Sequence, residues 1–342
     1  MKILTLIIPT YNAEKFLDKG LTSMILSKEN MDKLEVIVVN DGSPDASAEV
    51  AQKYVDQYPE TFCVLNKENG GHGSGINAGV RQAKGKYFKV IDADDWVDTK
   101  ALEETMEILE AEDFDALVQS YRTFDISKMP PEMKSIDIRY PNRELHPDYI
   151  YNFEELMSHA QDVAHCMTFH GITYNTKFYR DQHYDMPEKV FYEDQEYSTI
   201  PLCRAKRIRL LRTELYIYRI GDVNQSVSSQ SMLKRLDHFL TVEKRMLDFE
   251  PQLRKCPKGA YEFWLHKMSK FVTDIYRVML IKSEDKAKYR KDATALTKEL
   301  KEKAPRLYEA VKKKYLIFCG LNRMHVSDAA FQKMLDKRTV RR

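Results

Sequence analysis

The sequence predicts an α/β fold built on a mostly parallel sheet, followed by a helical C-terminal region. In the first 95 residues, four short apolar runs lack alternation, which is typical of strands covered on both faces. Helical patterns lie between these runs, and strand-helix-strand alternation favours parallel strands. After Ser231 the pattern is helical only, to about Leu316. We therefore expect an α/β domain over residues 1–230 and a helical region over residues 231–342.

Each predicted strand ends in polar or small residues. The four runs are residues 3–8, 36–39, 62–65 and 88–91. They are followed by Pro9-Thr10-Tyr11-Asn12, by Asn40-Asp41-Gly42-Ser43, by Asn66 with a glycine-rich loop at 70–75, and by Asp92-Ala93-Asp94-Asp95. Ligands of open α/β sheets bind beyond the carboxyl ends of the strands. The four clusters therefore predict one shared site.

The remaining elements follow from apolar spacing and from turn residues. Helical faces are predicted over residues 17–25 and 50–58, the second with Ser43 as N-cap and Pro44 at the first helical position. A helix is expected at 99–109, a strand at 116–124 and an irregular Pro-rich loop at 126–150. Residues 172–179 and 208–218 are expected to be strands at the far edge of the sheet. Apolar residues of the helical region lie at Leu233, Leu236, Phe239, Leu240, Trp264, Met268, Phe271 and Ile275.

Composition favours a cytoplasmic globular protein. Of the 342 residues, 43% are hydrophobic, which suffices for a substantial core. The five cysteines are scattered without a CxxC pair, which argues against a zinc site or a disulfide scaffold. No signal-peptide pattern is present at Met1, and charged residues interrupt the apolar segment 261–281, so we expect neither secretion nor a membrane span.

The C-terminal segment is strongly basic. Residues 301–342 contain 12 Lys and Arg against 4 Asp and Glu, a net charge of +8, which leaves −6 for residues 1–300. Lys312-Lys313-Lys314 precede the apolar Tyr315-Leu316-Ile317-Phe318. This pattern indicates an anionic partner, and we favour a membrane surface over a nucleic acid. The alternative is a solvated helix that packs on the catalytic domain or on a second subunit of a homo-oligomer.

Three carboxylates within four residues, Asp92, Asp94 and Asp95, follow the fourth strand. Because they repel one another, they predict a cation, and Mg²⁺ or Mn²⁺ prefers such oxygen ligands and shares them with phosphates. The alternative is an acidic turn that caps the helix beginning near Thr99.

Taken together, these motifs resemble the inverting family-2 glycosyltransferases of the GT-A fold, over roughly residues 3–228. The matching segments also include Tyr192-Glu193-Asp194 and Tyr216-Ile217-Tyr218-Arg219 followed by Ser226. The resemblance implies a nucleotide-diphosphate sugar donor and a Rossmann-like mixed sheet. It implies that Asp92 and Asp94 hold Mn²⁺ or Mg²⁺ while negative charge builds on the leaving diphosphate. Asp95 would join the metal or bind the donor sugar.

The donor residues that we expect are Pro9, Thr10, Tyr11, Asp41, Asn69, Gly70, Asn77, Asp92, Ala93, Asp95 and Arg219. The Asp41 carboxylate would accept the N3–H of uracil, with Thr10 and Tyr11 packing the base; the alternative is an Asx-turn. The glycine-rich loop would allow close approach to the donor or would be a flexible turn. His72 has no partner that the sequence reveals, so we expect it at the surface.

Inversion needs a base that takes the proton of the acceptor hydroxyl. The resemblance gives this role to Asp194, with Glu193 as the rival within the pair; the alternative is a solvated helix N-terminus. Paired carboxylates raise one another's pKa, which favours proton abstraction near neutral pH. Arg219 would supply a fixed charge to the donor diphosphate. Many family members carry arginine where this chain has Ile76, so the donor side departs from the family pattern.

Three other functions fit parts of the sequence. A nicotinamide-linked dehydrogenase would show GxGxxG after the first strand, where Pro9-Thr10-Tyr11-Asn12 stands instead. A nucleotidyltransferase would show a basic glycine-rich loop there. A non-catalytic nucleotide-binding module would not need Asp92, Asp94 and Asp194 intact. We therefore expect a hexosyl- or N-acetylhexosaminyl-transferase that uses a UDP-sugar and a glycan or lipid-linked acceptor in surface polysaccharide synthesis, either free in the cytoplasm or at the inner face of the plasma membrane.

Overall fold

The computed structural model describes residues 1–139, 145–146, 149–222 and 229–339. The chain divides into two compact units, which are described separately below. The first comprises Met1–Asp222 and Lys255–Ala260, and the second comprises Val223–Arg254 and Tyr261–Arg342. The expected division at residue 230 into functional domains stays a prediction.

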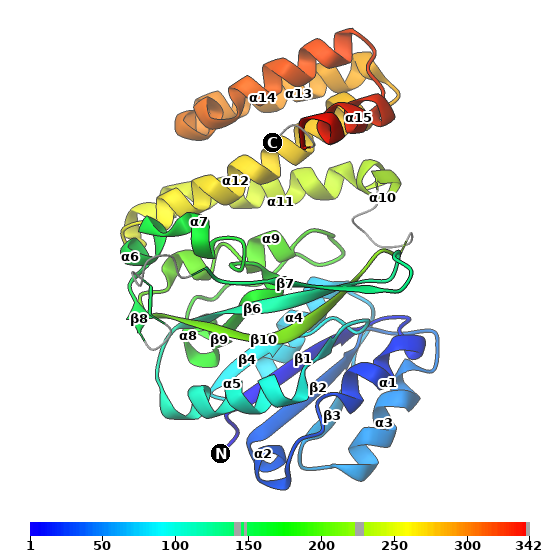
Figure 1. The fold of residues 1–342 in the computed structure, drawn as a ribbon, viewed down its shortest axis with the longest axis vertical. Coiled ribbons are helices and arrows are strands. Elements are labelled where there is room, and N and C mark those ends of the chain that lie inside the picture. The colour runs from blue at the N-terminus through cyan, green and yellow to red at the C-terminus, as the bar shows by residue number, and fades with distance from the viewer. Residues whose placement is uncertain (140–144, 147–148, 223–228, 340–342) are drawn as a thin grey trace. The chain divides into compact units, whose positions relative to one another are not determined.

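In the described part of the first unit, ten strands form one mixed sheet with the order β3-β2-β1-β4-β9-β6-β10-β5 (Figure 1). Strands β3, β2, β1 and β4 run parallel, whereas β9 is antiparallel to both of its neighbours, β4 and β6. Strand β7 adds to β6, and β8 adds to β10. The strands are β1 (Leu4–Thr10), β2 (Leu34–Asn40), β3 (Phe62–Asn66), β4 (Tyr87–Val90), β5 (Trp96–Val97), β6 (Ala116–Asp125), β7 (Glu132–Ile136), β8 (Ile150–Tyr151), β9 (Ile172–Asn175) and β10 (Ile208–Ile220).

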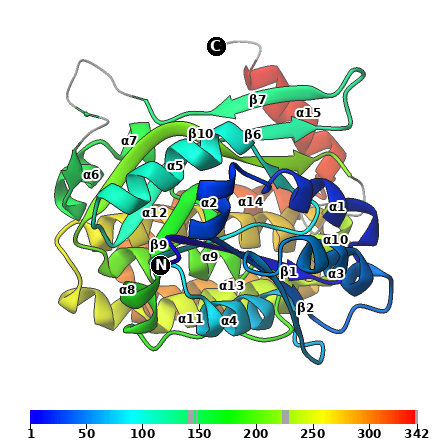
Figure 2. The same ribbon diagram turned by 90° about the horizontal axis from the view of Figure 1, so that it is seen from below.

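Helices cover both faces of this sheet, as the continuous apolar strands predicted. Figures 1 and 2 show α4 and α5 on opposite sides of it. The helices of this unit are α1 (Glu14–Thr22), α2 (Lys28–Lys33), α3 (Ser47–Gln57), α4 (His72–Gln82), α5 (Thr99–Ala111), α6 (Phe153–Ser158), α7 (Ala160–Val163), α8 (Thr176–Arg180) and α9 (Asp194–Tyr197).

Strand β1 shows how both faces are filled. Its residues Leu4, Leu6 and Ile8 belong to a core cluster that includes residues of α1, α3 and α5. The alternate residues Ile7 and Pro9 lie against glycines of α4, which lets that helix approach the sheet closely. Because successive side chains of a strand point to opposite faces, one apolar strand serves two layers.

Strand β10 carries an irregularity where it pairs with β6. Leu211 lies opposite Gln119, and the next paired residues are Tyr216 and Tyr121. Five steps along β10 therefore correspond to two along β6, so three extra residues bulge out of β10. After this bulge, Tyr216 and Tyr218 continue the strand.

Several sequence-based boundaries were wrong. Helix α3 begins at Ser47 after Ala46, not behind Ser43, because the Asp45 carboxylate accepts the Ser47 N–H and hydroxyl. The region 126–150 contains β7, so it is not wholly irregular. Strand β9 ends at Asn175, whose side chain caps α8, so residues 176–179 are helical. Strand β9 also lies inside the sheet and not at its far edge.

The second unit is helical in its described residues. Its elements are α10 (Ser229–Lys234), α11 (Leu236–Asp248), α12 (Ala260–Arg277), a π-helical turn (Val278–Lys282), α13 (Lys286–Lys303), α14 (Pro305–Arg323) and α15 (Asp328–Thr339). The predicted apolar positions Phe239, Trp264, Met268 and Ile275 are buried, and the Trp264 indole N–H donates to the Met246 carbonyl. Among the helices described, none is both long and apolar enough to cross a bilayer.

Candidate functional site

The polar clusters that follow the parallel strands lie at one edge of the sheet, as predicted. Thr10 of β1 pairs with Asn40 of β2, and Asn40 pairs with Asn66 of β3. On the other side of β1, Ile7 pairs with Val90 of β4, two residues before Asp92. The carboxyl ends of four strands therefore converge on one region, the usual place for a ligand in such sheets.

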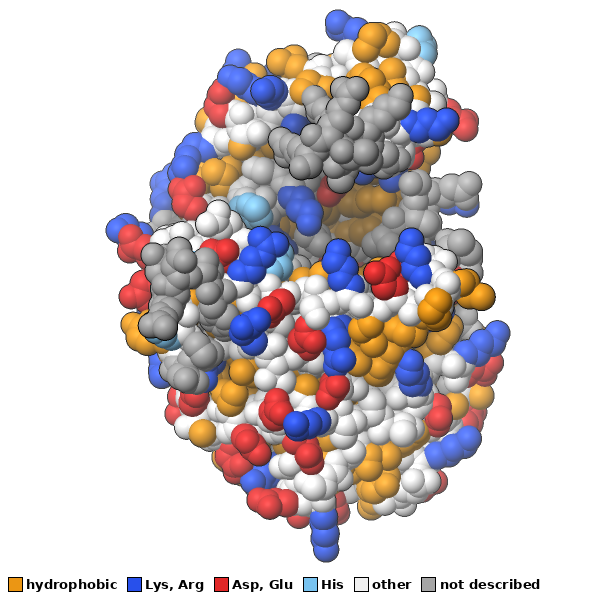
Figure 3. Space-filling view, in the orientation of Figure 1, with side chains coloured by type: hydrophobic (Ala, Val, Ile, Leu, Met, Phe, Trp, Pro, Cys, Tyr) orange, Lys and Arg blue, Asp and Glu red, His pale blue; other side chains and the backbone are white. Residues whose placement is uncertain are grey.

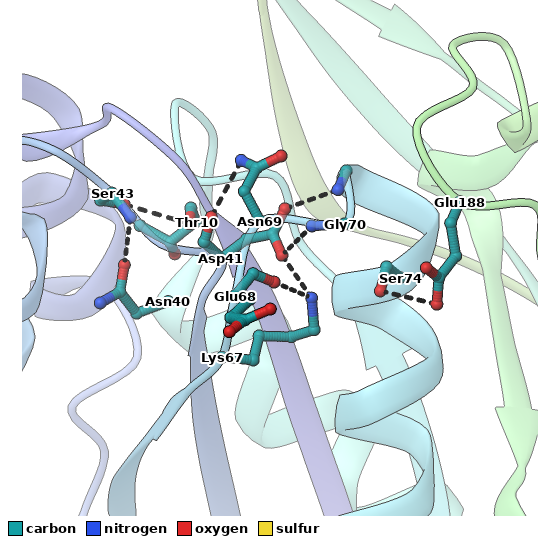
Figure 4. Close-up of polar contacts among 11 residues, drawn as sticks. Thr10, Asn40, Asp41, Ser43, Lys67, Glu68, Asn69, Gly70, Ser74 and Glu188 are labelled. Carbon is teal, nitrogen blue, oxygen red and sulfur yellow. Dashed lines mark hydrogen bonds and ion pairs between the residues drawn. The ribbon is translucent and has the colours of Figure 1, made fainter.

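Asp41 lies buried at this edge and binds the glycine-rich segment (Figure 4). Its carboxylate accepts hydrogen bonds from the Lys67 ammonium at 2.6 Å and from the backbone N–H groups of Gly70 at 2.9 Å and Gly71 at 2.7 Å. The Asn69 amide donates to the Asp41 carbonyl at 2.9 Å. Asp41 is therefore not a simple Asx-turn residue, because its side chain organises a segment about thirty residues away. Two carboxylate oxygens offer about four lone pairs, so one acceptor position remains.

The glycine-rich segment is more ordered than the sequence suggested. Gly71 has φ of +85°, a backbone conformation that glycine adopts without strain, and α4 begins directly after it at His72. The predicted loop over residues 70–75 is thus a turn followed by the first turn of a helix.

The three clustered carboxylates have different environments. Asp95 is buried, and it accepts the Tyr216 hydroxyl at 2.5 Å and the Arg219 N–H at 2.7 Å. Asp94 lies 3.7 Å from the Arg219 guanidinium. The Asp92 N–H donates to the Tyr216 hydroxyl at 3.1 Å. The end of β10 therefore meets the segment after β4. Ser226, which the sequence grouped with Tyr218 and Arg219, lies outside the described residues.

The electrostatics confirm that the three carboxylates crowd one another. Burial and the charge of Asp92 raise the pKa of Asp94 to about 6. Burial, Asp92 and Asp94 together raise the pKa of Asp95 well above its ordinary value. Both effects disfavour the charged forms and would be relieved by a bound cation. The alternative of a helix cap is wrong, because Asp98 is the side chain that caps α5 by accepting the Ala101 N–H.

His72 contradicts the expectation that it would lack a partner, although its side chain is 35% exposed. Its Nδ1 lies 2.6 Å from a Glu193 carboxylate oxygen, and its Nε2 lies 2.9 Å from an Asp92 oxygen. Burial opposes the charged form, but the two hydrogen bonds and the two negative charges outweigh it, so the pKa of His72 is well above 6.5. The imidazolium therefore donates to both carboxylates. Only one weak signal in the sequence pointed to this role, a lone histidine among the glycines that follow a strand.

His170 is a second residue that the sequence did not reveal. A ligand atom of His170, one of Asp92 and one of Asp95 all lie within 4.8 Å of one another, and among the described residues this is the group suited to a metal ion. The His170 ring stacks on Tyr218 with centroids 4.0 Å apart. Burial lowers the pKa of His170 to about 4, so its imidazole is neutral and able to bind a metal. Asp94, predicted as a ligand, is not part of this group.

The acidic pair lies close to this cluster. Glu193 is buried and bonded to His72, while Asp194 is the first residue of α9 and accepts the Gln195 amide at 2.9 Å. Burial is the main cause that raises the pKa of Tyr218, and the charge of Asp194 adds to it, so Asp194 lies near the end of β10. The structure thus brings the predicted acidic pair to the clustered carboxylates.

Other predicted donor residues have varied surroundings. Pro9 and Thr10 are buried at the end of β1, whereas Tyr11 is 55% exposed. Ala93 is buried between the acidic residues. The Asn77 amide is engaged with the N–H and carbonyl of Met186, at 3.0 and 2.9 Å. Donor contacts of these residues stay predictions.

Ile76, which stands where many family members carry arginine, is buried in α4. It therefore serves helix packing and offers no charge to a donor.

The chain is similar to several bacterial glycosyltransferases. It is 26% identical over 225 residues to the uncharacterized glycosyltransferase EpsJ of Bacillus subtilis, which covers 64% of this chain and 61% of that protein. It is 23% identical over 226 residues to the poly(ribitol-phosphate) beta-N-acetylglucosaminyltransferase TarS of Staphylococcus aureus, covering 66% of this chain and 37% of TarS. The chain thus aligns with less than two thirds of the length of either relative.

Among solved structures, the chain resembles S. aureus TarS 1–349 in complex with UDP-GlcNAc, with a TM-score of 0.65 at 17% identity over 95% of this chain and 93% of that one. This likeness shows the predicted GT-A fold with its helical C-terminal region. The family model described as "Glycosyl transferase family 2" matches residues 5–181, more than half of the chain. Given that match, the chain belongs to glycosyl transferase family 2.

Proposed function

We propose that this protein is an inverting glycosyltransferase that moves a sugar from a UDP-sugar to a hydroxyl group of a glycan or lipid-linked acceptor. One observation carries the proposal: Asp41, the glycine-rich turn, His72, the clustered carboxylates and Glu193 are linked by consecutive contacts along one edge of the sheet. Nucleotide recognition, diphosphate departure and proton abstraction need groups at three neighbouring places. This edge supplies all three.

In the proposed reaction, the acceptor oxygen attacks the anomeric carbon while the bond from that carbon to the diphosphate oxygen breaks. The Asp194 carboxylate takes the acceptor proton, and UDP leaves. The spare lone pair of Asp41 would accept the uracil N3–H, and Pro9, Thr10 and Tyr11 would border the base. Asn69, Gly70, Asn77 and Ala93 would complete the donor site. The Arg219 guanidinium, held near Asp94, would face the leaving diphosphate.

A divalent cation fits the acidic cluster. Asp92, Asp95 and His170 would hold it, since they combine oxygen ligands with one neutral imidazole. Asp94, which the family resemblance adds, would contribute a further carboxylate charge beside them. Mn²⁺ accepts an imidazole ligand more readily than Mg²⁺ does, so the donor set favours manganese. When bound, the ion would neutralise charge that develops on the diphosphate.

The proposal is tested by screening nucleotide sugars for slow hydrolysis and for binding in the presence of Mn²⁺ or Mg²⁺. A UDP-sugar should be hydrolysed and UDP should bind, with other nucleotides weaker. Preference for a GDP- or dTDP-sugar would contradict the assignment of the base. UDP binding without any turnover, even with a panel of glycan and lipid-linked acceptors, would favour the alternative of a non-catalytic binding module.

We further propose that the protein works at the inner face of the plasma membrane, where a lipid-linked acceptor of surface polysaccharide synthesis would lie. On α14, Leu307, Val311 and Phe318 are buried, whereas Leu316 and Ile317 are 64% and 50% exposed. Lys312, Lys313 and Lys314 are exposed one turn earlier. On the face seen in Figure 3, hydrophobic and basic side chains lie together over the helical unit. Such a surface suits shallow insertion into an anionic bilayer.

Co-sedimentation with vesicles checks this location. The protein should bind vesicles of anionic lipid at low salt, bind neutral vesicles weakly, and dissociate at high salt, because screening weakens the attraction. Lys313→Glu should reduce binding, while the matched change Lys298→Glu on α13, whose side chain is 79% exposed, should reduce it less. If the protein does not bind anionic vesicles at low salt, α14 has a structural role only, for example as a contact with a second subunit.

A further inference from the structure

His72 joins two carboxylates that belong to separate parts of the site. Asp92 lies 20 residues away, after β4, and Glu193 lies 121 residues away, next to α9. The two contacts measure 2.9 and 2.6 Å, and the Glu193 side chain is only 5% exposed. A single rigid ring therefore spans the acidic cluster and the acidic pair.

Helix α4 places the ring by approaching the segment 186–193 very closely. A Cβ added at Gly73 would lie 2.7 Å from the Pro187 carbonyl oxygen and 3.3 Å from Glu193 Cγ. A Cβ at Gly71 would lie 2.9 Å from the Lys189 nitrogen. Only glycine fits on both sides of His72, so the backbone is shaped to bring this residue against Glu193.

Three further contacts dock the same segment along α4, and one of them is the hydrogen bond that the Ser74 hydroxyl donates to the Glu188 carboxylate at 3.2 Å (Figure 4). The Lys189 N–H donates to the Gly70 carbonyl at 2.7 Å. The Asn77 amide exchanges two hydrogen bonds with the Met186 backbone. These contacts fix the start and the middle of the segment. The contact with His72 is the one that reaches its end, where the acidic pair lies.

We propose that His72 is a positioning residue, which holds Glu193, and with it the adjacent Asp194, at a set distance from Asp92. This inference rests on the proposed function, in which Asp194 takes the acceptor proton and Asp92 faces the leaving group. The imidazole ring suits the task because its two nitrogens point in opposite directions from one rigid ring. A side-chain amide carries both donors on one nitrogen, so it cannot bridge two carboxylates in this way.

The test compares His72→Asn with His183→Asn. Asparagine is tolerated at the start of a helix but is too short to bridge both carboxylates. His183 is exposed and has φ of +48°, which asparagine also tolerates, so it controls for the same chemical change on the segment that follows α8. His72→Asn should lower kcat for the UDP-sugar about 10- to 100-fold, because small displacements of a reacting group cost rates of this order. The Kd for UDP with Mn²⁺ should change less than about threefold. His183→Asn should match the wild type in both.

Hydrogen–deuterium exchange supplies a readout that needs no turnover. In His72→Asn, amides of residues 186–193 should exchange faster than in the wild type, while those of β1 and β2 stay unchanged. Glu193→Gln should act through the same contact with His72. The double variant that carries both His72→Asn and Glu193→Gln should therefore have a kcat close to that of the more impaired single variant.

Two results would overturn the inference. One is that amide exchange and kcat of His72→Asn match those of the wild type. The other is that the affinity for UDP falls by the same factor as kcat, because His72 would then belong to the donor site. If the wild type transfers no sugar, the proposed function fails, yet the exchange experiment still decides whether His72 positions the segment.

Discussion

Asp194→Asn is expected to retain UDP affinity but to lose at least about two orders of magnitude in transfer rate, the usual contribution of a general base. The structure gives a reason to favour Asp194 over Glu193 within the pair. The Glu193 carboxylate is buried and bonded to His72 at 2.6 Å, which leaves it poorly placed to reach an acceptor hydroxyl. Asp194 is the first residue of α9. Its charge adds to the effect of burial in raising the pKa of Tyr218, which lies at the end of β10.

Steady-state kinetics with the best UDP-sugar, together with calorimetry using UDP, measure the two effects separately. Asp181→Asn is the matched control, because that carboxylate is 61% exposed and pairs with Lys177 on α8. Near-normal turnover of Asp194→Asn would move the role of base to Glu193 or to another residue. Loss of UDP binding would instead assign Asp194 to the donor site.

The second large effect is expected for Asp94→Asn, which should abolish transfer while the melting temperature stays close to that of the wild type. Asp94 is one of three crowded carboxylates, and burial with Asp92 raises its pKa to about 6. Removing its charge relieves repulsion in the apoprotein, so the fold should not suffer. It also removes charge that the metal and the leaving diphosphate require.

Calorimetry of UDP binding provides the measurement. The wild type should bind UDP more tightly with Mn²⁺ than with EDTA, and Asp94→Asn should lose most of this difference. Asp113→Asn, with a side chain that is 73% exposed and pairs with Lys86, is the control. Equal affinity of the wild type in both conditions would contradict the metal assignment. A metal effect that survives in Asp94→Asn would restrict the ligands to Asp92, Asp95 and His170.

The sequence predicted the parts of this protein that depend on local patterns. Uninterrupted apolar runs identified β1 to β4, and the polar residues after them identified the edge of the sheet that carries the site. Because these strands pair in parallel, their carboxyl ends lie at the same edge of the sheet. The strand pattern is therefore enough to predict that Asp41 and the acidic cluster lie at that edge. Apolar spacing also predicted the C-terminal helices as far as Leu316, whereas the end of α14 and all of α15 lie beyond that prediction.

What the sequence could not predict depends on partners distant along the chain. Strand β9 inserts between β4 and β6, and no local property of residues 172–175 distinguishes an inner strand from an edge strand. His72 was expected at the surface because its partners Asp92 and Glu193 lie in other segments. His170 follows the same rule, since its role depends on Asp92 and Asp95, which lie more than seventy residues earlier in the chain.

The bulge in β10 determines on which face of the sheet the side chains of Tyr216, Tyr218 and Arg219 lie. Side chains alternate along a strand, so an odd number of extra residues reverses their direction, and the bulge contains three. Tyr216 owes its contact with Asp95 to that parity. Deleting one residue between Leu211 and Tyr216 would preserve the strand and its hydrophobicity but turn this tyrosine away from the carboxylates. Among homologous chains, this segment should therefore change in length only by even numbers, while Leu215, which is buried in the core, should stay apolar.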